Sequence, residues 1–225
     1  MCTLAVYFRA FDDFPLIIAA NRDEHYDRPS APPSVLDTTP KIISGRDLRA
    51  GGTWLGFNER GLVVAILNRH SNDGPPLLPS GRSRGALCMD LLMQNSVSDA
   101  AAFLKEHRIH YNPFTLLFAD PIAAYVAHNE GQAILTQKLG TGLHVFSSAA
   151  DFELHSSKAR RAEALFAELK DRTPMLGRDL SASIRALQAV LADHSLPPDS
   201  TNPGDAICVH REISGTVSSS ILFFS

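Results

Sequence analysis

The stretch MCTLAVYFRAFDDFPLIIAANRDE, residues 1–24, decides the fold of this chain because it predicts a strand hairpin. Two apolar runs rich in β-forming residues, 3–9 and 16–20, flank a set of turn-forming residues. With the turn in the middle, the numbers of paired residues sum to about 25. Cys2 is therefore expected to face the charged end of the second strand, Arg22-Asp23-Glu24.

Cys2 would carry two reactive groups if Met1 is removed, as aminopeptidases do when a small residue follows the initiator. An α-amino group has a pKa of roughly 7.7–8.0 and can act as a base near neutral pH. A thiol, with a pKa of about 8.5, needs only modest help to become the nucleophilic thiolate. One residue could thus supply both the nucleophile and the base of a hydrolase.

The charged triplet opposite Cys2 has two interpretations. The guanidinium of Arg22 beside the thiol would favour the thiolate, and the carboxylate of Asp23 or Glu24 could orient the ammonium or the attacked group. Alternatively, Cys2 stands there by chance and the triplet is a solvated strand end, since charge clusters are common at such ends.

Length and composition predict an ordered globular protein. A chain of 225 residues can bury one substantial core, and 44% hydrophobic with 20% charged residues is typical of globular domains. The net charge of −3 predicts no nucleic-acid partner. No apolar run approaches the ~18 residues of a membrane span, and acidic residues interrupt the N-terminal apolar stretch. We therefore expect a cytoplasmic protein, with its oligomeric state left open.

The cysteines and histidines predict neither disulfides nor a metal site. Cys2, Cys88 and Cys208 are widely spaced and form no CxxC motif, which fits a reducing compartment. Cys88 in an expected helix and Cys208 in an expected strand are interpreted as small core residues. The nine histidines are dispersed, and His107 and His110 have no partner at metal-ligand spacing, so we expect surface or core histidines.

A second hairpin is expected from residues 50–55 and 61–68. In that hairpin Asn68 lies opposite Gly51 or Gly52, where missing side chains allow close backbone approach. Residues 28–40, with four prolines, are expected to be irregular.

The rest of the chain predicts an α+β protein. Apolar residues at helical spacing predict amphipathic helices over 158–170 and 180–192, and Ser96 or Ser98 is expected to cap a helix over 100–107. We expect one layered domain over residues 1–225, with helices covering one face of each sheet. The other expected elements are a helix over 86–92 and strands at 114–119, 122–128, 133–139, 143–146, 206–210 and 217–224.

Several motifs in order carry a family resemblance. The chain begins Met1-Cys2-Thr3, continues with Ala19-Ala20-Asn21-Arg22-Asp23-Glu24 and Arg28-Pro29, and then has Gly51-Gly52-Thr53-Trp54-Leu55-Gly56. Further matches are Asn68, Tyr111-Asn112, Phe114, Ile207-Cys208 and Ser214-Gly215-Thr216. Together they resemble the NRDE family, also called the transport and Golgi organisation 2 family. The resemblance implies the N-terminal-nucleophile hydrolase fold, an αββα sandwich of two mainly antiparallel sheets between helical layers.

A more distant similarity concerns the chemistry. Residues 57–68 resemble the second hairpin of choloylglycine hydrolases and penicillin V acylases. That similarity implies that Cys2 is nucleophile and base, that Arg22 and Asp23 attend it, and that Asn68 donates to the oxyanion. Such a donor contributes about 2.7–4 kcal/mol in the transition state. The candidate binding residues are Asn21, Glu24, Trp54 and Ser148, and Trp54 is equally well interpreted as a core anchor.

Two positions depart from these families. The chain has Ser147-Ser148 where the family usually has Ser-Asn. It also has Val217, in the run Gly-Thr-Val-Ser, where the family usually has an arginine. The expected site therefore lacks one amide and one guanidinium.

Two functions are compatible with this sequence. The first is hydrolysis of a linear amide in a small acylated molecule through a Cys2 thioester, without metal or cofactor. The alternative is a binding protein on the same scaffold that carries haem or an acyl lipid, with Cys2 as a ligand or a relic. Both haem handling and lipid metabolism have been proposed for the family, and a fold does not fix a function.

Overall fold

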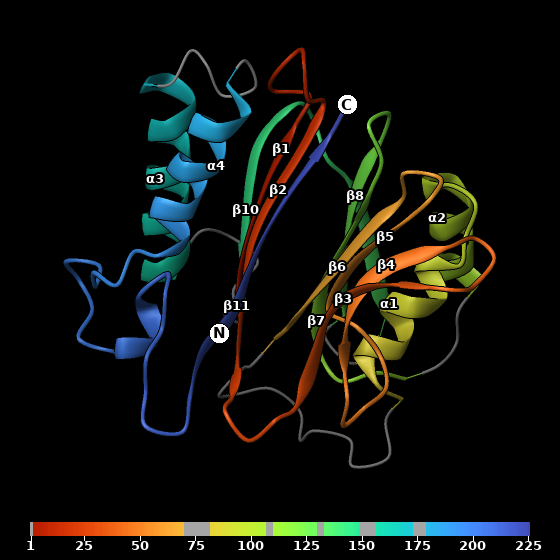
Figure 1. Cartoon of the computed structure of the whole chain (residues 1–225), viewed down its shortest axis with the longest axis horizontal. Coiled ribbons are helices and arrows are strands. Elements are labelled where there is room, and N and C mark those ends of the chain that lie inside the picture. Colours follow the sequence, from red (N-terminus) through yellow and green to blue (C-terminus); the bar gives the residue numbers. More distant parts are fainter. Residues whose placement is uncertain (1, 70–81, 107–109, 130–132, 149–155, 173–178) are drawn as a thin grey trace. The chain divides into compact units, whose positions relative to one another are not determined.

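The computed structural model describes residues 2–69, 82–106, 110–129, 133–148, 156–172 and 179–225. The chain forms two compact units (Figure 1). The first unit contains residues 1–27 and 140–225, and the second contains residues 28–139. Among the described residues, each unit has one sheet and one helix pair. The expectation of a single domain over residues 1–225 stays a prediction.

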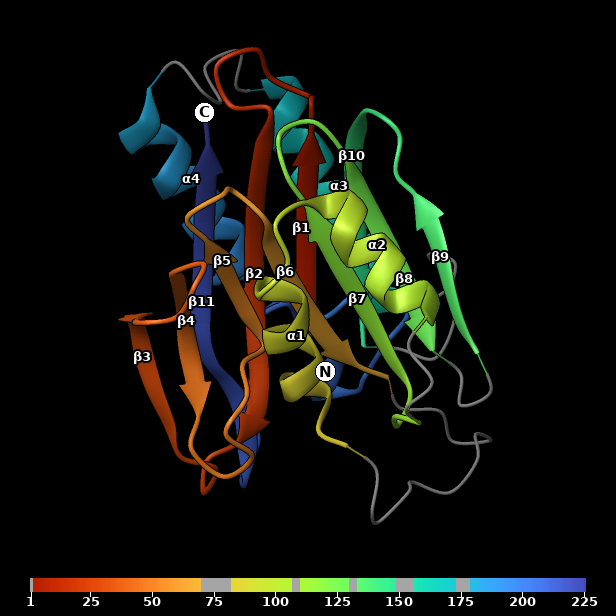
Figure 2. The ribbon, with the colours of Figure 1, turned by 90° about the vertical axis from the view of Figure 1, so that its right-hand side faces the viewer.

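The sheet of the first unit has the strand order β10-β1-β2-β11, which the turned view shows side by side (Figure 2). All its pairings are antiparallel. The predicted N-terminal hairpin is confirmed, with a register one residue away from the expected one, because Thr3 pairs with Asn21. The strands are β1 (Thr3–Phe8), β2 (Leu16–His25), β10 (Gly142–Ser147) and β11 (Ser214–Phe224).

Two helices, α3 (Ser157–Arg172) and α4 (Leu180–Leu191), pack on one face of this sheet (Figure 1). Both were predicted from their apolar spacing. Alternate residues of a strand point to the same face of the sheet. Tyr7 and the residues two positions away from it along β1 therefore face the helices. The Tyr7 hydroxyl donates a hydrogen bond to the Phe166 carbonyl at 2.6 Å. The buried core of this interface contains Ala5, Tyr7, Ile17, Ala19, Ala162, Phe166, Leu187 and Leu191.

The second unit is a seven-stranded antiparallel sheet with the strand order β3-β4-β5-β6-β7-β8-β9. Helices α1 (Arg84–Leu92) and α2 (Val97–Glu106) pack on it, and the hydroxyl of Ser96 accepts a hydrogen bond from the Asp99 amide at the start of α2. Of the two predicted caps, Ser96 is therefore the one found. The strands are β3 (Ser30–Leu36), β4 (Ile42–Asp47), β5 (Leu55–Asn58), β6 (Val63–Asn68), β7 (Phe114–Ala119), β8 (Ala124–Asn129) and β9 (Ile134–Lys138).

The prediction of irregular structure for residues 28–40 was wrong, because strand β3 lies in this segment. Strand β3 is at the edge of its sheet, and its pairing with β4 shifts register between Ala31 and Ser34. Pro32 and Pro33 fall at this shift. A proline cannot donate to a ladder, and edge positions and bulges are where strands tolerate it.

The second hairpin begins later than predicted, since its first strand is β5 and residues 50–54 precede it. The close approach predicted at Gly51 or Gly52 occurs at Gly52, but its partner is the start of α1. A Cβ on Gly52 would lie 2.3 Å from the carbonyl carbon of Gly85, and the Thr53 amide donates to that carbonyl at 3.2 Å. Any side chain at Gly52 would displace this helix terminus.

The strand predicted at residues 206–210 is not formed. A short 3₁₀ turn, η1 (Pro203–Asp205), is followed by bends, and the segment makes an isolated bridge between His210 and Gly215. Cys208 is half-buried there rather than a core residue. Within the described part of the chain, no helix is both long and apolar enough to cross a membrane.

Candidate active site around Cys2

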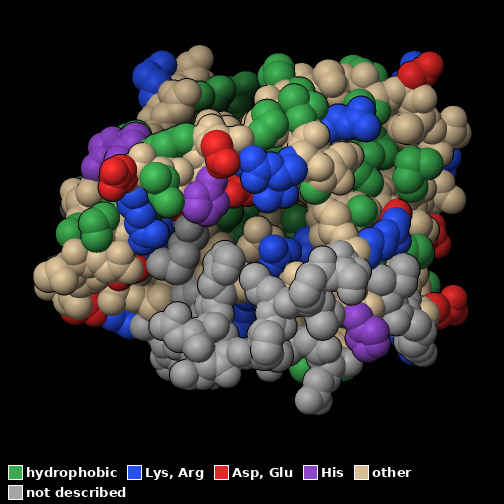
Figure 3. Space-filling view, turned by 90° about the horizontal axis from the view of Figure 1, so that it is seen from below, with side chains coloured by type: hydrophobic (Ala, Val, Ile, Leu, Met, Phe, Trp, Pro, Cys, Tyr) green, Lys and Arg blue, Asp and Glu red, His purple; other side chains and the backbone are tan. Residues whose placement is uncertain are grey.

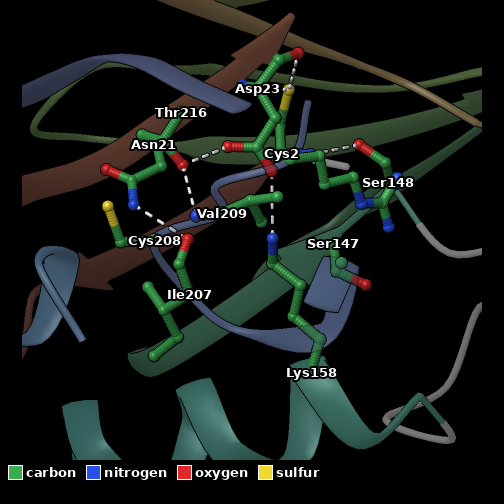
Figure 4. A network of polar contacts seen from close by, with 12 residues as sticks. Cys2, Asn21, Asp23, Ser147, Ser148, Lys158, Ile207, Cys208, Val209 and Thr216 are labelled. Carbon is green, nitrogen blue, oxygen red and sulfur yellow. Dashed lines mark hydrogen bonds and ion pairs between the residues drawn. The ribbon is translucent and has the colours of Figure 1, made fainter. Parts of the chain in front are cut away.

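Cys2 directly precedes β1, where β10 ends on one side and β2 continues to His25 on the other. Thr3 pairs with Ser147 on one side and with Asn21 on the other, so Cys2 meets the residues that follow these partners. Its backbone nitrogen donates to the Ser148 hydroxyl at 2.8 Å, and its carbonyl accepts from the Ser148 amide at 3.2 Å (Figure 4). The position of the nitrogen is therefore fixed.

The thiol of Cys2 is held by the backbone of Asp23. The Asp23 amide donates to the sulfur at 3.4 Å, and the sulfur lies 3.8 Å from the Asp23 carbonyl oxygen (Figure 4). The side chain is half-buried. The sulfur and the nitrogen of Cys2 thus have separate partners, Asp23 within β2 and Ser148 just after β10.

The electrostatic surroundings raise the pKa of the Cys2 thiol above its ordinary value. Burial is the largest cause, and the negative charge of Asp23 adds to it. The terminal amino group, the Asp23 amide and Lys158 act in the opposite direction without overcoming them. The expectation that Arg22 would make this thiol an activated thiolate was wrong, and near neutral pH the thiol needs a base.

Asp23 is held in place by a buried ion pair. Its carboxylate accepts from the Lys158 ammonium at 3.0 Å and from the Thr216 hydroxyl at 2.6 Å (Figure 4). The side chains of Lys158 and Asp23 are 0% and 4% exposed. The Thr216 hydroxyl also accepts from the Val209 amide at 2.9 Å. The carboxylate beside the nucleophile is therefore tied to α3 and β11.

Sequence reasoning missed Lys158. In the sequence it is one more charge on an amphipathic helix, and 135 positions separate it from its partner. One weak signal exists, because a cation in the first turn of a helix opposes the helix dipole. Lys158 lies in the first turn of α3.

Asn21 is a positioning residue for this site. Its amide donates to the carbonyls of Leu191 at 2.8 Å and Ile207 at 3.0 Å, and its oxygen accepts from the Ser219 hydroxyl at 2.7 Å. The residue is 2% exposed. These bonds join β2 to the end of α4, to the segment around Ile207 and to β11, and the predicted role of Asn21 as a ligand contact stays a prediction.

We expect Asn21→Ala to lower the free energy of unfolding by about 2–4 kcal/mol, because it leaves two buried carbonyls without a donor. Urea unfolding monitored by circular dichroism measures this as a lower midpoint. Ser219→Ala removes a single bond from the same amide and should cost about 1 kcal/mol. An Asn21→Ala midpoint equal to that of Ser219→Ala would contradict the assignment.

Arg22 and Glu24 form an ion pair at 3.5 Å, with side chains 7% and 16% exposed. They alternate with Asp23 along β2 and so project from the opposite face of the sheet. Lys158 holds the Asp23 carboxylate, and Arg22 forms an ion pair with Glu24.

Asn68 and Trp54 belong to the second unit. Asn68 ends β6, where its backbone pairs with Phe114. Trp54 packs on β4, since a Cβ on Gly45 would lie 2.7 Å from its ring. The roles predicted for Asn68 and Trp54 toward the thiol stay predictions.

Comparison with known proteins places these observations in a family. The family model described as Transport and Golgi organisation 2 matches residues 1–224. The Transport and Golgi organization protein 2 homolog of Bos taurus is 32% identical over 217 residues, which cover 87% of this chain and 75% of the bovine protein.

Solved structures show the fold. An N-acylethanolamine-hydrolyzing acid amidase ortholog of Caenorhabditis elegans aligns with a TM-score of 0.60 at 12% identity, over 97% of this chain and 100% of that chain. A mutant conjugated bile acid hydrolase of Clostridium perfringens aligns with a TM-score of 0.60 at 13% identity, over 99% of this chain and 86% of that chain. The N-terminal-nucleophile hydrolase-like fold predicted from the sequence is confirmed, and with the match over residues 1–224 the chain belongs to the transport and Golgi organisation 2 family.

Proposed function

We propose that this chain is a cysteine N-terminal-nucleophile amidohydrolase that cleaves a linear amide in a small acylated molecule. The observation that supports the proposal best is the separate anchoring of the two reactive groups of Cys2. Its nitrogen lies 2.8 Å from the Ser148 hydroxyl, and its sulfur lies 3.4 Å from the Asp23 amide. The fold shared with an amidase and a bile acid hydrolase supports the same class of reaction.

Removal of Met1 would convert the Cys2 amide nitrogen into an amine. Because the pKa of the thiol is raised, this amine must take the thiol proton as the sulfur attacks the substrate carbonyl carbon. Collapse of the tetrahedral intermediate breaks the carbon–nitrogen bond, and the leaving amine takes the proton from the ammonium. Water, deprotonated by the same amine, then hydrolyses the thioester, which releases the acid and restores the thiol.

The surrounding residues have distinct roles in this proposal. Ser148 orients the nitrogen, and Lys158 with Thr216 holds the Asp23 carboxylate in place. Asp23 favours the ammonium that forms when the amine accepts the thiol proton. Asn68 is proposed to donate to the oxyanion, and Glu24 and Trp54 are proposed to contact the substrate. The reaction uses no metal or cofactor.

The proposal predicts a covalent adduct on Cys2. Protein whose intact mass confirms the loss of Met1 is incubated with a β-lactone or an activated ester. We expect a mass increase of one acyl group, which peptide mapping locates on Cys2, because the amine beside the sulfur removes its proton. A matched control carries extra residues before Met1, so that the thiol is present but its nitrogen stays an amide. This control should acylate far more slowly.

Two results would contradict the proposal. One is an equal rate of acylation in the control, which would mean that the Cys2 nitrogen takes no part. The other is an absence of acylation together with stoichiometric haem binding and a Soret shift, which would favour the binding alternative.

A further inference from the structure

A second group of reactive side chains lies in the first unit, in the segment between α4 and β11. His194, Cys208 and His210 have their ligand atoms within 4.8 Å of one another. The Cys208 sulfur is 3.8 Å from the Nε2 atom of His210, and the two imidazole rings have centroids 4.9 Å apart. Both histidines are exposed, and Cys208 is half-buried.

Backbone contacts bring these residues together. His194 follows the end of α4, and the Cys208 amide donates to the Asp193 carbonyl at 2.9 Å. His210 is fixed by its bridge to Gly215 of β11. The cluster is therefore assembled from two segments that backbone hydrogen bonds hold in place.

The distances suit a tetrahedral zinc site. Zinc bonds of about 2.3 Å to sulfur and 2.0–2.1 Å to nitrogen place ligand atoms roughly 3.3–3.6 Å apart. The sulfur–nitrogen distance of 3.8 Å is close to this value, and the widest separation is 4.8 Å. Rotation of two exposed imidazoles can remove the remaining difference.

The hydrogen bonding of His194 also suits a ligand. Its Nδ1 atom lies 3.3 Å from the Cys208 carbonyl oxygen. With the proton on Nδ1, that nitrogen donates to the carbonyl and leaves Nε2 as a lone-pair donor. A backbone carbonyl on the second ring nitrogen is the usual support of a metal-bound histidine.

An open pocket adjoins the cluster. Its volume is about 390 Å³, and it is lined by His194, Leu196, Pro203, Ala206, Cys208 and His210. The segment lies at the lower side of Figure 1, and the view from below shows histidine side chains on that face (Figure 3). A metal held by the three side chains would have its fourth position directed to this pocket.

We infer that His194, Cys208 and His210 bind one Zn²⁺ ion, with water in the fourth position. Binding forms one zinc–sulfur and two zinc–nitrogen bonds, and the Cys208 thiol proton passes to solvent. Cys208-Val209-His210 does not have the common spacing of zinc ligands, and His194 is remote in sequence. This is why sequence spacing alone predicts no metal site here.

The zinc site would be connected to the Cys2 site by short paths. Ile207 and Val209 flank Cys208, and they bond to Asn21 and Thr216 of the Cys2 site, respectively (Figure 4). Thr216 in turn donates to Asp23. Zinc is expected to order this segment, so its occupancy should also raise the melting temperature of the protein.

The test uses the full-length protein, stripped with a chelator and titrated with Zn²⁺ by calorimetry and with Co²⁺ by absorption spectroscopy. We expect one ion per chain and a thiolate-to-cobalt charge-transfer band. Cys208→Ser should abolish the band, and His210→Gln should weaken Zn²⁺ binding at least ~10-fold. Neither readout depends on amide hydrolysis, so failure here is distinguishable from failure of the proposed function.

Cys2→Ser and His144→Gln are the matched controls. Cys2 is another half-buried cysteine, and His144 is a histidine on β10, at the other edge of the sheet. Both variants should keep the cobalt band and the affinity of the parent chain. A band that survives in Cys208→Ser, or one that disappears in Cys2→Ser, would overturn the assignment. The same holds if a folded parent chain gives no band, or if Zn²⁺ raises the melting temperature of Cys208→Ser as much as that of the parent.

Discussion

Replacement of Cys2 by alanine is expected to reduce the rate of hydrolysis of an acyl amide by roughly 10³–10⁶-fold, which is the usual effect of removing a catalytic nucleophile. The attacking sulfur is lost, whereas the backbone contacts of Cys2 with Ser148 remain. The measurement is the release of a fluorescent amine from a fatty-acyl amide, with kcat/KM taken per folded molecule. Circular dichroism verifies that the variant is folded.

Cys88→Ala is the control for this prediction. Cys88 is buried in α1, and burial raises the pKa of its thiol well above its ordinary value. Its removal should leave kcat/KM per folded molecule within about threefold of the parent. If Cys2→Ala kept more than a tenth of the parent activity, Cys2 would not be the nucleophile and the proposed mechanism would be abandoned.

The parts of the fold that could be predicted from the sequence rest on local patterns. The hairpin of β1 and β2 has two β-rich apolar runs around a turn, and Thr3 pairs within one residue of the expected register. The helices α3 and α4 show the 3.6-residue apolar period and begin and end within two residues of the prediction. Periodicity is informative where one face of an element is buried.

The elements that were missed depend on tertiary context. Strand β3 is an edge strand whose prolines fall where pairing with β4 shifts, and a sequence does not reveal which strands form an edge. Residues 206–210 are apolar enough for a strand, but individual hydrogen bonds join them to Asp193 after α4, to Asn21 of β2 and to Thr216 of β11. The β-strand preference of this segment therefore differs from the irregular backbone that it adopts.

The residues of the candidate site also divide into those that local sequence patterns predict and those that they do not. Cys2 and Asp23 could be placed together because one hairpin connects them. Lys158 and the His194, Cys208 and His210 cluster could not, because their partners are distant in sequence or have no known spacing motif. The direction of the thiol pKa also depends on burial, which the sequence does not give.

Lys158→Met is expected to lower the free energy of unfolding by about 3–5 kcal/mol, because it leaves the Asp23 carboxylate buried without its cation. The Lys158 side chain is fully buried and lies 3.0 Å from that carboxylate. For a chain of this size the loss corresponds to a fall of roughly 6–20 °C in melting temperature. Urea unfolding and differential scanning calorimetry measure both quantities.

The control substitution is Lys170→Met, which removes an exposed lysine from the same helix and should change stability by less than about 0.5 kcal/mol.

The double variant Asp23→Asn with Lys158→Met replaces the ion pair by two neutral side chains of similar size. Since removal of both charges avoids an uncompensated buried charge, most of the stability should return. If the double variant were as unstable as the two single variants added together, Lys158 would act through packing and not through the charge of Asp23. Recovery of stability without recovery of hydrolysis is the expected pattern, because the Asp23 carboxylate that the lysine holds is proposed to stabilise the ammonium of Cys2.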